Sequence, residues 1–132
     1  MSLERILLAV LAAFVLLAGV GCLVAPSLFA QQAQFQATPS ALAEIRAFYG
    51  GLQLGIGLFL VWCLRTPSRT SQGLLLIGLA VGGAGLARMF GIFFDHAPTS
   101  HHLANLGIEV VTVVLVAIAL SRGRRQPTGA AV

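Results

Sequence analysis

The stretch that decides the fold class is ILLAVLAAFVLLAGVGCLVA, residues 6–25, which holds no charged side chain and is followed by Pro26. A helix of about 20 residues, at about 1.5 Å per residue, crosses the roughly 30 Å of hydrocarbon in a bilayer. A secretory signal peptide has a shorter apolar core of about 7–15 residues. It also needs a small residue three positions before its cleavage point, and for a cleavage point near Ala30 that position is occupied by Leu28. We therefore expect a retained transmembrane helix.

Three further apolar segments follow, each close to the length that spans a bilayer. The second ends at Arg65-Thr66-Pro67, the third at Asp95-His96, and the fourth at an Arg-rich run from Arg122. The composition agrees, with 58% hydrophobic and 9% charged residues and a mean hydropathy of +0.93. The sequence therefore predicts an all-α, polytopic membrane protein that forms one domain over residues 1–132. The expected architecture is an antiparallel bundle of four transmembrane helices, followed by a tail over 121–132. The expected helices lie at about 6–25, 42–64, 73–94 and 103–120.

The basic residues predict the orientation rather than a nucleic-acid partner. The net charge is +4 and the pI about 10.6, but the arginines stand at segment ends without interleaved aromatic residues. Arg5, the pair Arg65 and Arg69, and the C-terminal arginines fall on one side of the expected bundle, whereas the loops 26–41 and 95–102 hold none. The positive-inside rule then predicts an inner-membrane protein with both termini in the cytoplasm.

The first outer loop, residues 26–41, is rich in glutamine and carries Leu28, Phe29 and Phe35. It suits either a short helix on the membrane surface or an irregular loop. Ser40 is the expected N-cap of the second segment. Cys22 and Cys63 are expected near opposite membrane faces, too far apart for a disulfide.

Ionisable residues inside the apolar segments mark the expected functional region. Glu44 and Arg46 lie in the second segment, Arg88 in the third and Glu109 in the fourth. A charge in hydrocarbon costs at least about 2.5–3.5 kcal/mol, so such residues usually face a bundle interior and pair with one another. We expect Arg88 and Glu109 to contact each other, since they lie at one depth on consecutive antiparallel helices.

Helical spacing groups these charges with other polar residues. Arg46, Tyr49 and Gln53 recur at i, i+3 and i+7, and Tyr49, Arg88 and Glu109 share a level roughly 10 Å below the outer interface. The pattern predicts a polar pocket that opens outward between the second, third and fourth segments. Its expected ligand-binding residues are Glu44, Arg46, Tyr49, Gln53, Arg88 and Glu109. The alternative is that Arg88–Glu109 and Glu44–Arg46 are structural ion pairs.

Two other features leave alternatives open. Small residues recur every four positions in the second and third segments, at Ala47, Gly51 and Gly55 and at Gly78 and Gly82, which suits helix packing within the chain or a homodimer face. A loop brings Asp95 near the histidines His96, His101 and His102, but their spacing matches no standard metal motif, so no metal site is assigned. No catalytic triad or phosphate-binding loop is present, and no catalytic residue is assigned.

The run Glu44-Ile45-Arg46-Ala47-Phe48-Tyr49-Gly50-Gly51 resembles the signature of a small bacterial family of four-helix membrane proteins of unknown function. Ala87-Arg88-Met89-Phe90-Gly91 and Ile108-Glu109 also resemble that family, and the resemblance covers nearly the whole chain. It implies a four-helix bundle with these charges at polar positions. More distantly, the family is similar to the DoxX-like group, some of whose members are membrane subunits of quinone-linked oxidoreductases and others maturation factors for periplasmic redox enzymes.

The function expected from the sequence is a non-enzymatic binding or accessory protein of the inner membrane. Its ligand would be a small amphipathic or anionic molecule, namely a lipid headgroup, a quinone or an organic anion. A membrane subunit of a quinone-linked redox complex and a small oligomeric transporter are the alternatives. Expected partners are membrane lipid and either further copies of the chain or a membrane redox protein. No bound cofactor is predicted, and the distant resemblance makes quinone the one to consider.

Overall fold

The structure is a computed structural model that describes residues 2–95 and 99–123. Throughout these residues the regular structure is helical, which confirms the all-α class. Four helical stretches are long and apolar enough to cross a membrane, so the chain is a multi-pass membrane protein by length and composition. The elements are α1 (Leu3–Val24), α2 (Pro26–Gln32), α3 (Pro39–Glu44), the π-helix η1 (Ile45–Gly51), α4 (Leu52–Arg65), the 3-10 turn η2 (Pro67–Arg69), α5 (Thr70–Phe94) and α6 (Ser100–Gly123).

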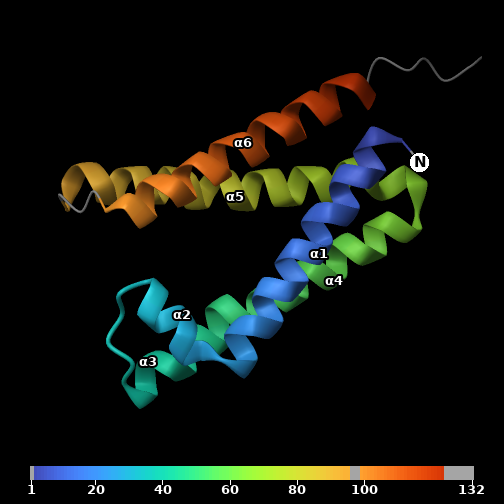
Figure 1. Cartoon of the computed structure of the whole chain (residues 1–132). Helices are drawn as coiled ribbons and strands as arrows, with labels where there is room; N and C mark the ends of the chain where they lie inside the picture. The colour runs from blue at the N-terminus through green and yellow to red at the C-terminus, as the bar shows by residue number, and fades with distance from the viewer. Residues whose placement is uncertain (1, 96–98, 124–132) are drawn as a thin grey trace, which may run out of the picture.

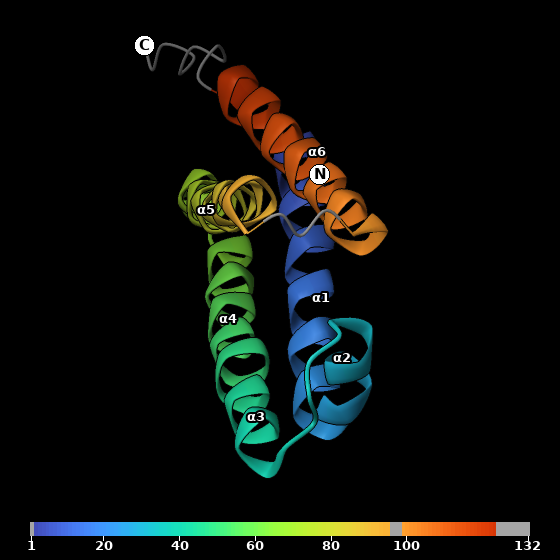
Figure 2. The same cartoon turned by 90° about the vertical axis from the view of Figure 1, so that its left-hand side faces the viewer.

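The four long stretches form two helical hairpins. α1 packs along η1 and α4, and α5 packs along α6. Figure 1 shows the two hairpins meeting near the N-terminus and diverging from there, and Figure 2 shows α1 and α4 side by side while α5 and α6 cross at an angle. The antiparallel bundle of four helices expected from the sequence is therefore not confirmed.

The main apolar core lies where the hairpins meet. It contains Leu8 and Ala12 of α1, Leu60 and Cys63 of α4, Leu74 and Ile77 of α5, and Val116 and Ala119 of α6. In lipid, apolar side chains gain little by leaving the acyl chains for another helix, and helices associate where small residues allow close approach. Gly73 illustrates this, because a β-carbon there would lie 3.0 Å from Cys63 and from Leu8.

The ends of the helices differ from their predicted positions by a few residues. The helix that crosses the membrane second begins at Pro39 rather than near 42, and its N-cap is Thr38 rather than Ser40. The Thr38 hydroxyl accepts a hydrogen bond from the backbone N–H of Ala41 at 3.2 Å, while Pro39 occupies the first helical position, where its missing N–H costs nothing. α6 continues to Gly123, and the rest of the expected tail lies outside the described residues.

The loop expected over residues 26–41 contains the short helix α2. Ala30 of α2, Cys22 of α1 and Ile45 of η1 form a second, smaller core at this end of the first hairpin. Cys63 belongs to the main core at the other end, and both cysteines are free thiols.

Glycine allows α1 and η1 to approach closely. A β-carbon on Gly50 would lie 2.8 Å from the Leu23 side chain, and one on Gly19 would lie 3.1 Å from the Gly50 carbonyl oxygen. These contacts coincide with the π-helical turn, a rare form that mostly appears as a single turn inserted in an α-helix, often at functional sites.

Candidate functional site

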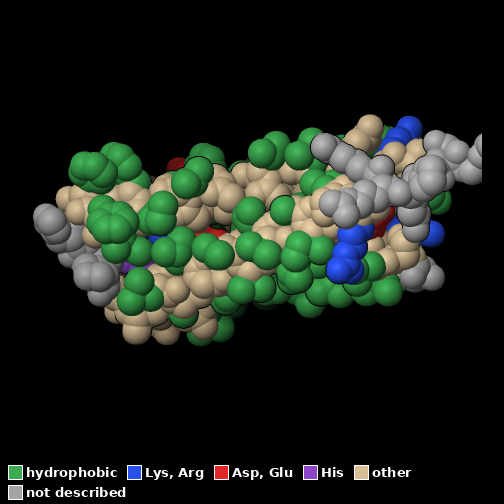
Figure 3. Space-filling model, turned by 90° about the horizontal axis from the view of Figure 1, so that it is seen from above, with side chains coloured by type: hydrophobic (Ala, Val, Ile, Leu, Met, Phe, Trp, Pro, Cys, Tyr) green, Lys and Arg blue, Asp and Glu red, His purple; other side chains and the backbone are tan. Residues whose placement is uncertain are grey.

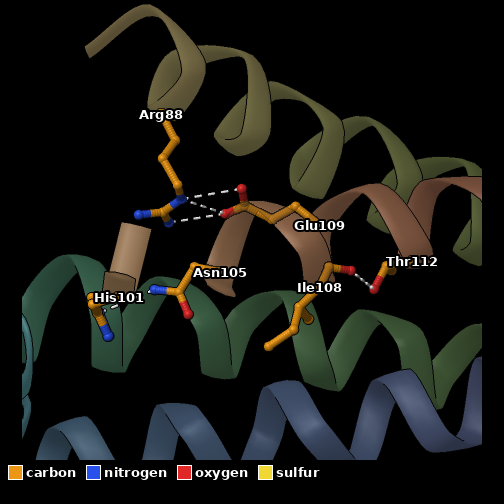
Figure 4. Close-up of polar contacts among 6 residues, drawn as sticks. All are labelled: Arg88, His101, Asn105, Ile108, Glu109 and Thr112. Atoms are coloured by element: carbon orange, nitrogen blue, oxygen red, sulfur yellow. Dashed lines mark hydrogen bonds and ion pairs between the residues drawn. The ribbon is translucent and has the colours of Figure 1, made fainter. Parts of the chain in front are cut away.

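Arg88 of α5 and Glu109 of α6 form a two-pronged ion pair within the second hairpin. The Arg88 Nε donates to both carboxylate oxygens of Glu109 at 3.1 Å, and Nη2 donates to Oε1 at 2.9 Å. In Figure 4 the two side chains point toward each other across the gap between their helices. The predicted Arg88–Glu109 contact is therefore confirmed, and its fork geometry is the strongest kind of arginine–carboxylate interaction.

The pair is largely withdrawn from the surface, with 27% of the Arg88 side chain and 13% of the Glu109 side chain exposed. Nε and Nη2 of Arg88 donate to Glu109. The third guanidinium nitrogen, Nη1, makes no hydrogen bond to any residue that the structure describes. The guanidinium thus keeps donor capacity for an oxygen from outside the chain.

Glu109 also lines an apolar groove between α5 and α6, with a volume of about 330 Å³. This volume is at the lower end of the range for small-molecule pockets. The remaining lining residues are glycine and apolar side chains: Val81, Gly82, Gly85, Leu86, Met89, Leu106, Val110, Val113 and Val114. Figure 3 shows this seam from outside, with red and purple side chains visible between green ones, while blue side chains gather at the end where the N-terminus lies.

Small residues on α5 give the groove its floor. A β-carbon on Gly85 would lie 3.4 Å from both Cβ and Oε2 of Glu109, and one on Gly82 would lie 3.6 Å from Val113. The four-residue spacing of Gly78 and Gly82 indicated close helix packing. The additional role of Gly85, which leaves room for the Glu109 carboxylate, was missed because it requires knowing that these two residues face each other.

The other residues expected at the site lie on the first hairpin. Arg46 donates through Nε to the backbone carbonyl of Leu23, at the end of α1, at 3.4 Å. The Tyr49 ring packs against Phe29 of α2, with ring centroids 4.6 Å apart and the ring planes tilted by 38°. Gln53 is half-buried in α4. The structure therefore does not join the three polar stripes in one pocket, but divides the six residues into two groups.

The residues separate into two groups because the polar face of the second membrane span packs against α1. Gly50 and Gly57 contact Leu23 and Leu16 of α1 so closely that a β-carbon would come within 2.8 Å and 2.6 Å of those side chains. The same face carries Arg46 against the end of α1. The glycines thus direct this stripe toward the first helix rather than toward α5 and α6.

Glu44 and Arg46 do not form the ion pair that the sequence suggested as an alternative. The one ion pair among residues 2–95 and 99–123 is Arg88–Glu109. Glu44 instead lines a second cavity of about 510 Å³ at the end of the first hairpin, together with Phe35, Ala41, Ile45, Phe48 and Tyr49.

The N-terminal end of α6 carries His101 and His102, whose ring centroids lie 6.2 Å apart. His101 Nε2 and Asn105 Nδ2 lie 3.1 Å apart, as Figure 4 shows, and Thr112 donates to the carbonyl of Ile108 in its own helix at 2.8 Å. The described part of the chain brings together no three residues of the metal-binding types. His96 lies outside the described residues.

Comparison with known proteins identifies a family without assigning an activity. The family model for a domain of unknown function, DUF4345, matches residues 3–120. No curated protein and no solved structure matches the chain.

Proposed function

Because the chain belongs to the DUF4345 family, a family defined without a known function, we propose its role from its own geometry. It is a membrane-embedded binding or accessory protein, and its binding site is the groove between α5 and α6. The ligand is a small amphipathic molecule with an oxygen-bearing end: a lipid headgroup, a quinone or an organic anion.

One observation carries this proposal: Glu109, on the wall of an apolar groove between two candidate membrane spans, is held there by an ion pair with Arg88. Charges at this depth are expensive and are commonly retained for function. An apolar groove with a few convergent polar groups is also the usual form of a small-molecule site.

The proposed contacts follow from the donors of the guanidinium. Nε and Nη2 of Arg88 hold Glu109, which fixes the plane of the guanidinium. Nη1 then donates to a carbonyl, carboxylate or phosphate oxygen of the ligand. The apolar part of the ligand lies along Gly82, Val110 and Val113, whose side chains offer no polar atoms.

We place the chain in the inner membrane with both termini in the cytoplasm. Arg5 and Arg69 support this orientation, because they lie at the end of the molecule where the hairpins meet. Arg5 Nη2 donates to the carbonyl of Leu64 at 3.1 Å, and the Arg69 guanidinium lies 3.9 Å from the Trp62 ring centroid. Arginine is enriched at the cytoplasmic ends of membrane spans, whereas tryptophan is enriched at both interfaces, so the arginines carry the orientation.

The test compares two glycines of α5. Gly82 lines the groove, and a leucine there would extend past Val113 and fill it, whereas a β-carbon on Gly83 meets nothing within 4 Å. Protein purified in mild detergent is extracted, and bound lipids and quinones are identified by mass spectrometry. Gly82→Leu should lose a molecule that the wild type and Gly83→Leu retain. Equal retention by all three proteins would reject the groove as the site.

The identity of the retained molecule separates the candidate functions. A stoichiometric quinone would favour a membrane subunit of a redox complex, and a phospholipid or organic anion would favour a binding or accessory protein. Flux of that molecule into proteoliposomes, abolished by Gly82→Leu and kept by Gly83→Leu, would favour a transporter.

A further inference from the structure

The cavity that Glu44 lines has a different chemistry from the groove and is separate from it. Its walls include the rings of Phe35, Phe48 and Tyr49, and it has a volume of about 510 Å³. Glu44 is the one charged residue among its lining residues. The cavity therefore combines a single negative charge with several aromatic rings.

No described cation neutralises Glu44. Arg46, the nearest arginine in sequence, donates to the Leu23 carbonyl and does not line the cavity. The ion pair of the described chain is on the other hairpin. Glu44 is exposed at the rim of the cavity, so a cation from outside the chain can reach its carboxylate.

The aromatic rings favour the same sign of charge. The faces of phenylalanine and tyrosine rings carry negative partial charge and attract ammonium groups, and several rings together form the usual recognition site for quaternary ammonium compounds. Phe29 of α2 packs against two of these rings, with its ring centroid 4.6 Å from that of Tyr49 and 6.4 Å from that of Phe35.

The position of the cavity indicates where the cation comes from. Ala41 and Glu44 are the third and sixth residues of the span Pro39–Arg65, so the acidic end of the cavity lies within about 8 Å of the end of that span. A lipid headgroup can reach this end from the membrane interface, whichever way the protein faces.

We propose that Glu44, Phe35, Phe48 and Tyr49 form a binding site for an organic ammonium group, occupied by the amine headgroup of a zwitterionic phospholipid. The ammonium lies against the rings and pairs with the Glu44 carboxylate, and the acyl chains remain in the bilayer beside the exposed face of Phe48. This site is independent of the α5–α6 groove, since the two share no lining residue.

The test measures lipid preference by native mass spectrometry of protein released from nanodiscs that contain equal amounts of phosphatidylethanolamine and phosphatidylglycerol. The wild type should retain phosphatidylethanolamine preferentially. Glu44→Gln keeps the side-chain shape and removes the charge, so it should reduce that preference about fivefold. Asp95→Asn, which removes an exposed carboxylate at the end of the other hairpin, should leave the preference unchanged.

A second pair of variants tests the rings. Phe48→Leu keeps an apolar side chain and removes the ring face, so it should weaken retention about two- to fivefold. Phe59→Leu, at a ring that stacks on Trp62 outside the cavity, should have no effect. Normal melting temperatures for all four variants would show that each protein folds.

A separate arm identifies the source of the ammonium group. Saturation-transfer NMR with choline and with ethanolamine detects binding of the free compounds, and binding that Glu44→Gln removes would support the ammonium site with a soluble ligand. Equal retention of the two lipids by the wild type, with no binding of either free amine, would overturn the proposal. A preference that survives both Glu44→Gln and Phe48→Leu would overturn it as well.

Discussion

Removing one partner of the Arg88–Glu109 pair should destabilise the protein much more than removing both. Arg88→Met takes away the two nitrogens that lie 2.9–3.1 Å from the Glu109 carboxylate. Because 13% of the Glu109 side chain is exposed, little water or headgroup is available to replace them. Breaking a buried pair costs about 3–5 kcal/mol, because one charge remains without a partner.

The expected loss lies near the lower end of this range. The cost of an isolated charge deep in a membrane span is about 2.5–3.5 kcal/mol on insertion scales. We therefore expect a loss of about 2.5–3.5 kcal/mol for Arg88→Met.

The reverse single variant should show a similar loss. Glu109→Gln removes the carboxylate and leaves the Arg88 guanidinium without its charged partner, so we expect a deficit of about 2–3 kcal/mol.

The double variant tests whether the two residues act as a pair. Arg88→Met with Glu109→Gln leaves no charge, and such neutral replacements are often harmless. We expect a deficit below about 1.5 kcal/mol, measured with both single variants by equilibrium unfolding in mixed detergent micelles. Losses that add up within about 0.5 kcal/mol would mean that the two residues are not coupled, and would refute the pairing.

Three further predictions concern the fold. Gly50→Val should destabilise the protein by at least about 2 kcal/mol, because its side chain would overlap α1, and Gly51→Ala should be neutral, because a β-carbon there meets its nearest atom at 3.7 Å; equal melting temperatures would contradict this packing. Thr38→Ala should lower the free energy of unfolding by about 1 kcal/mol, because it removes the N-cap hydrogen bond, and should speed amide hydrogen exchange in the first turn of α3. Unchanged exchange there would contradict the capping role of Thr38. In a cysteine-free background, an impermeant reagent applied to spheroplasts should label a cysteine at Ser100 and spare one at Ser68, and the reverse result would invert the topology.

The contact between Arg88 and Glu109 could be predicted from the sequence, because it depends only on how deep each residue lies in the membrane. Arg88 and Glu109 lie on consecutive spans at one level, and within hydrocarbon an ion pair is far more stable than two separate charges. Their contact therefore needed no knowledge of how the hairpins sit relative to each other. The four membrane spans were predictable for a similar reason, since bilayer thickness fixes their length.

The direction of the second polar stripe could not be predicted in the same way. Spacing placed Arg46, Tyr49 and Gln53 on one face of an ideal α-helix, but it could not indicate which neighbour that face would contact. The face also carries Gly50, and a glycine surface is where helix backbones come together in lipid. Close packing of Gly50 against α1 therefore directs the stripe away from α5 and α6.

The π-helical turn changes this argument further, because it alters the angle between successive residues over Ile45–Gly51. An α-helical wheel drawn through this turn misplaces residues on either side relative to one another. Glu44 precedes the turn and faces a cavity, whereas Arg46 within it reaches the end of α1. The Glu44–Arg46 pair, which the sequence left as an alternative, is therefore not formed: residues two apart do not face each other on a helix, Arg46 donates to a backbone carbonyl, and Glu44 has no counterion among the described residues. That separation is what makes the Glu44 cavity suitable for an ammonium group from outside the chain.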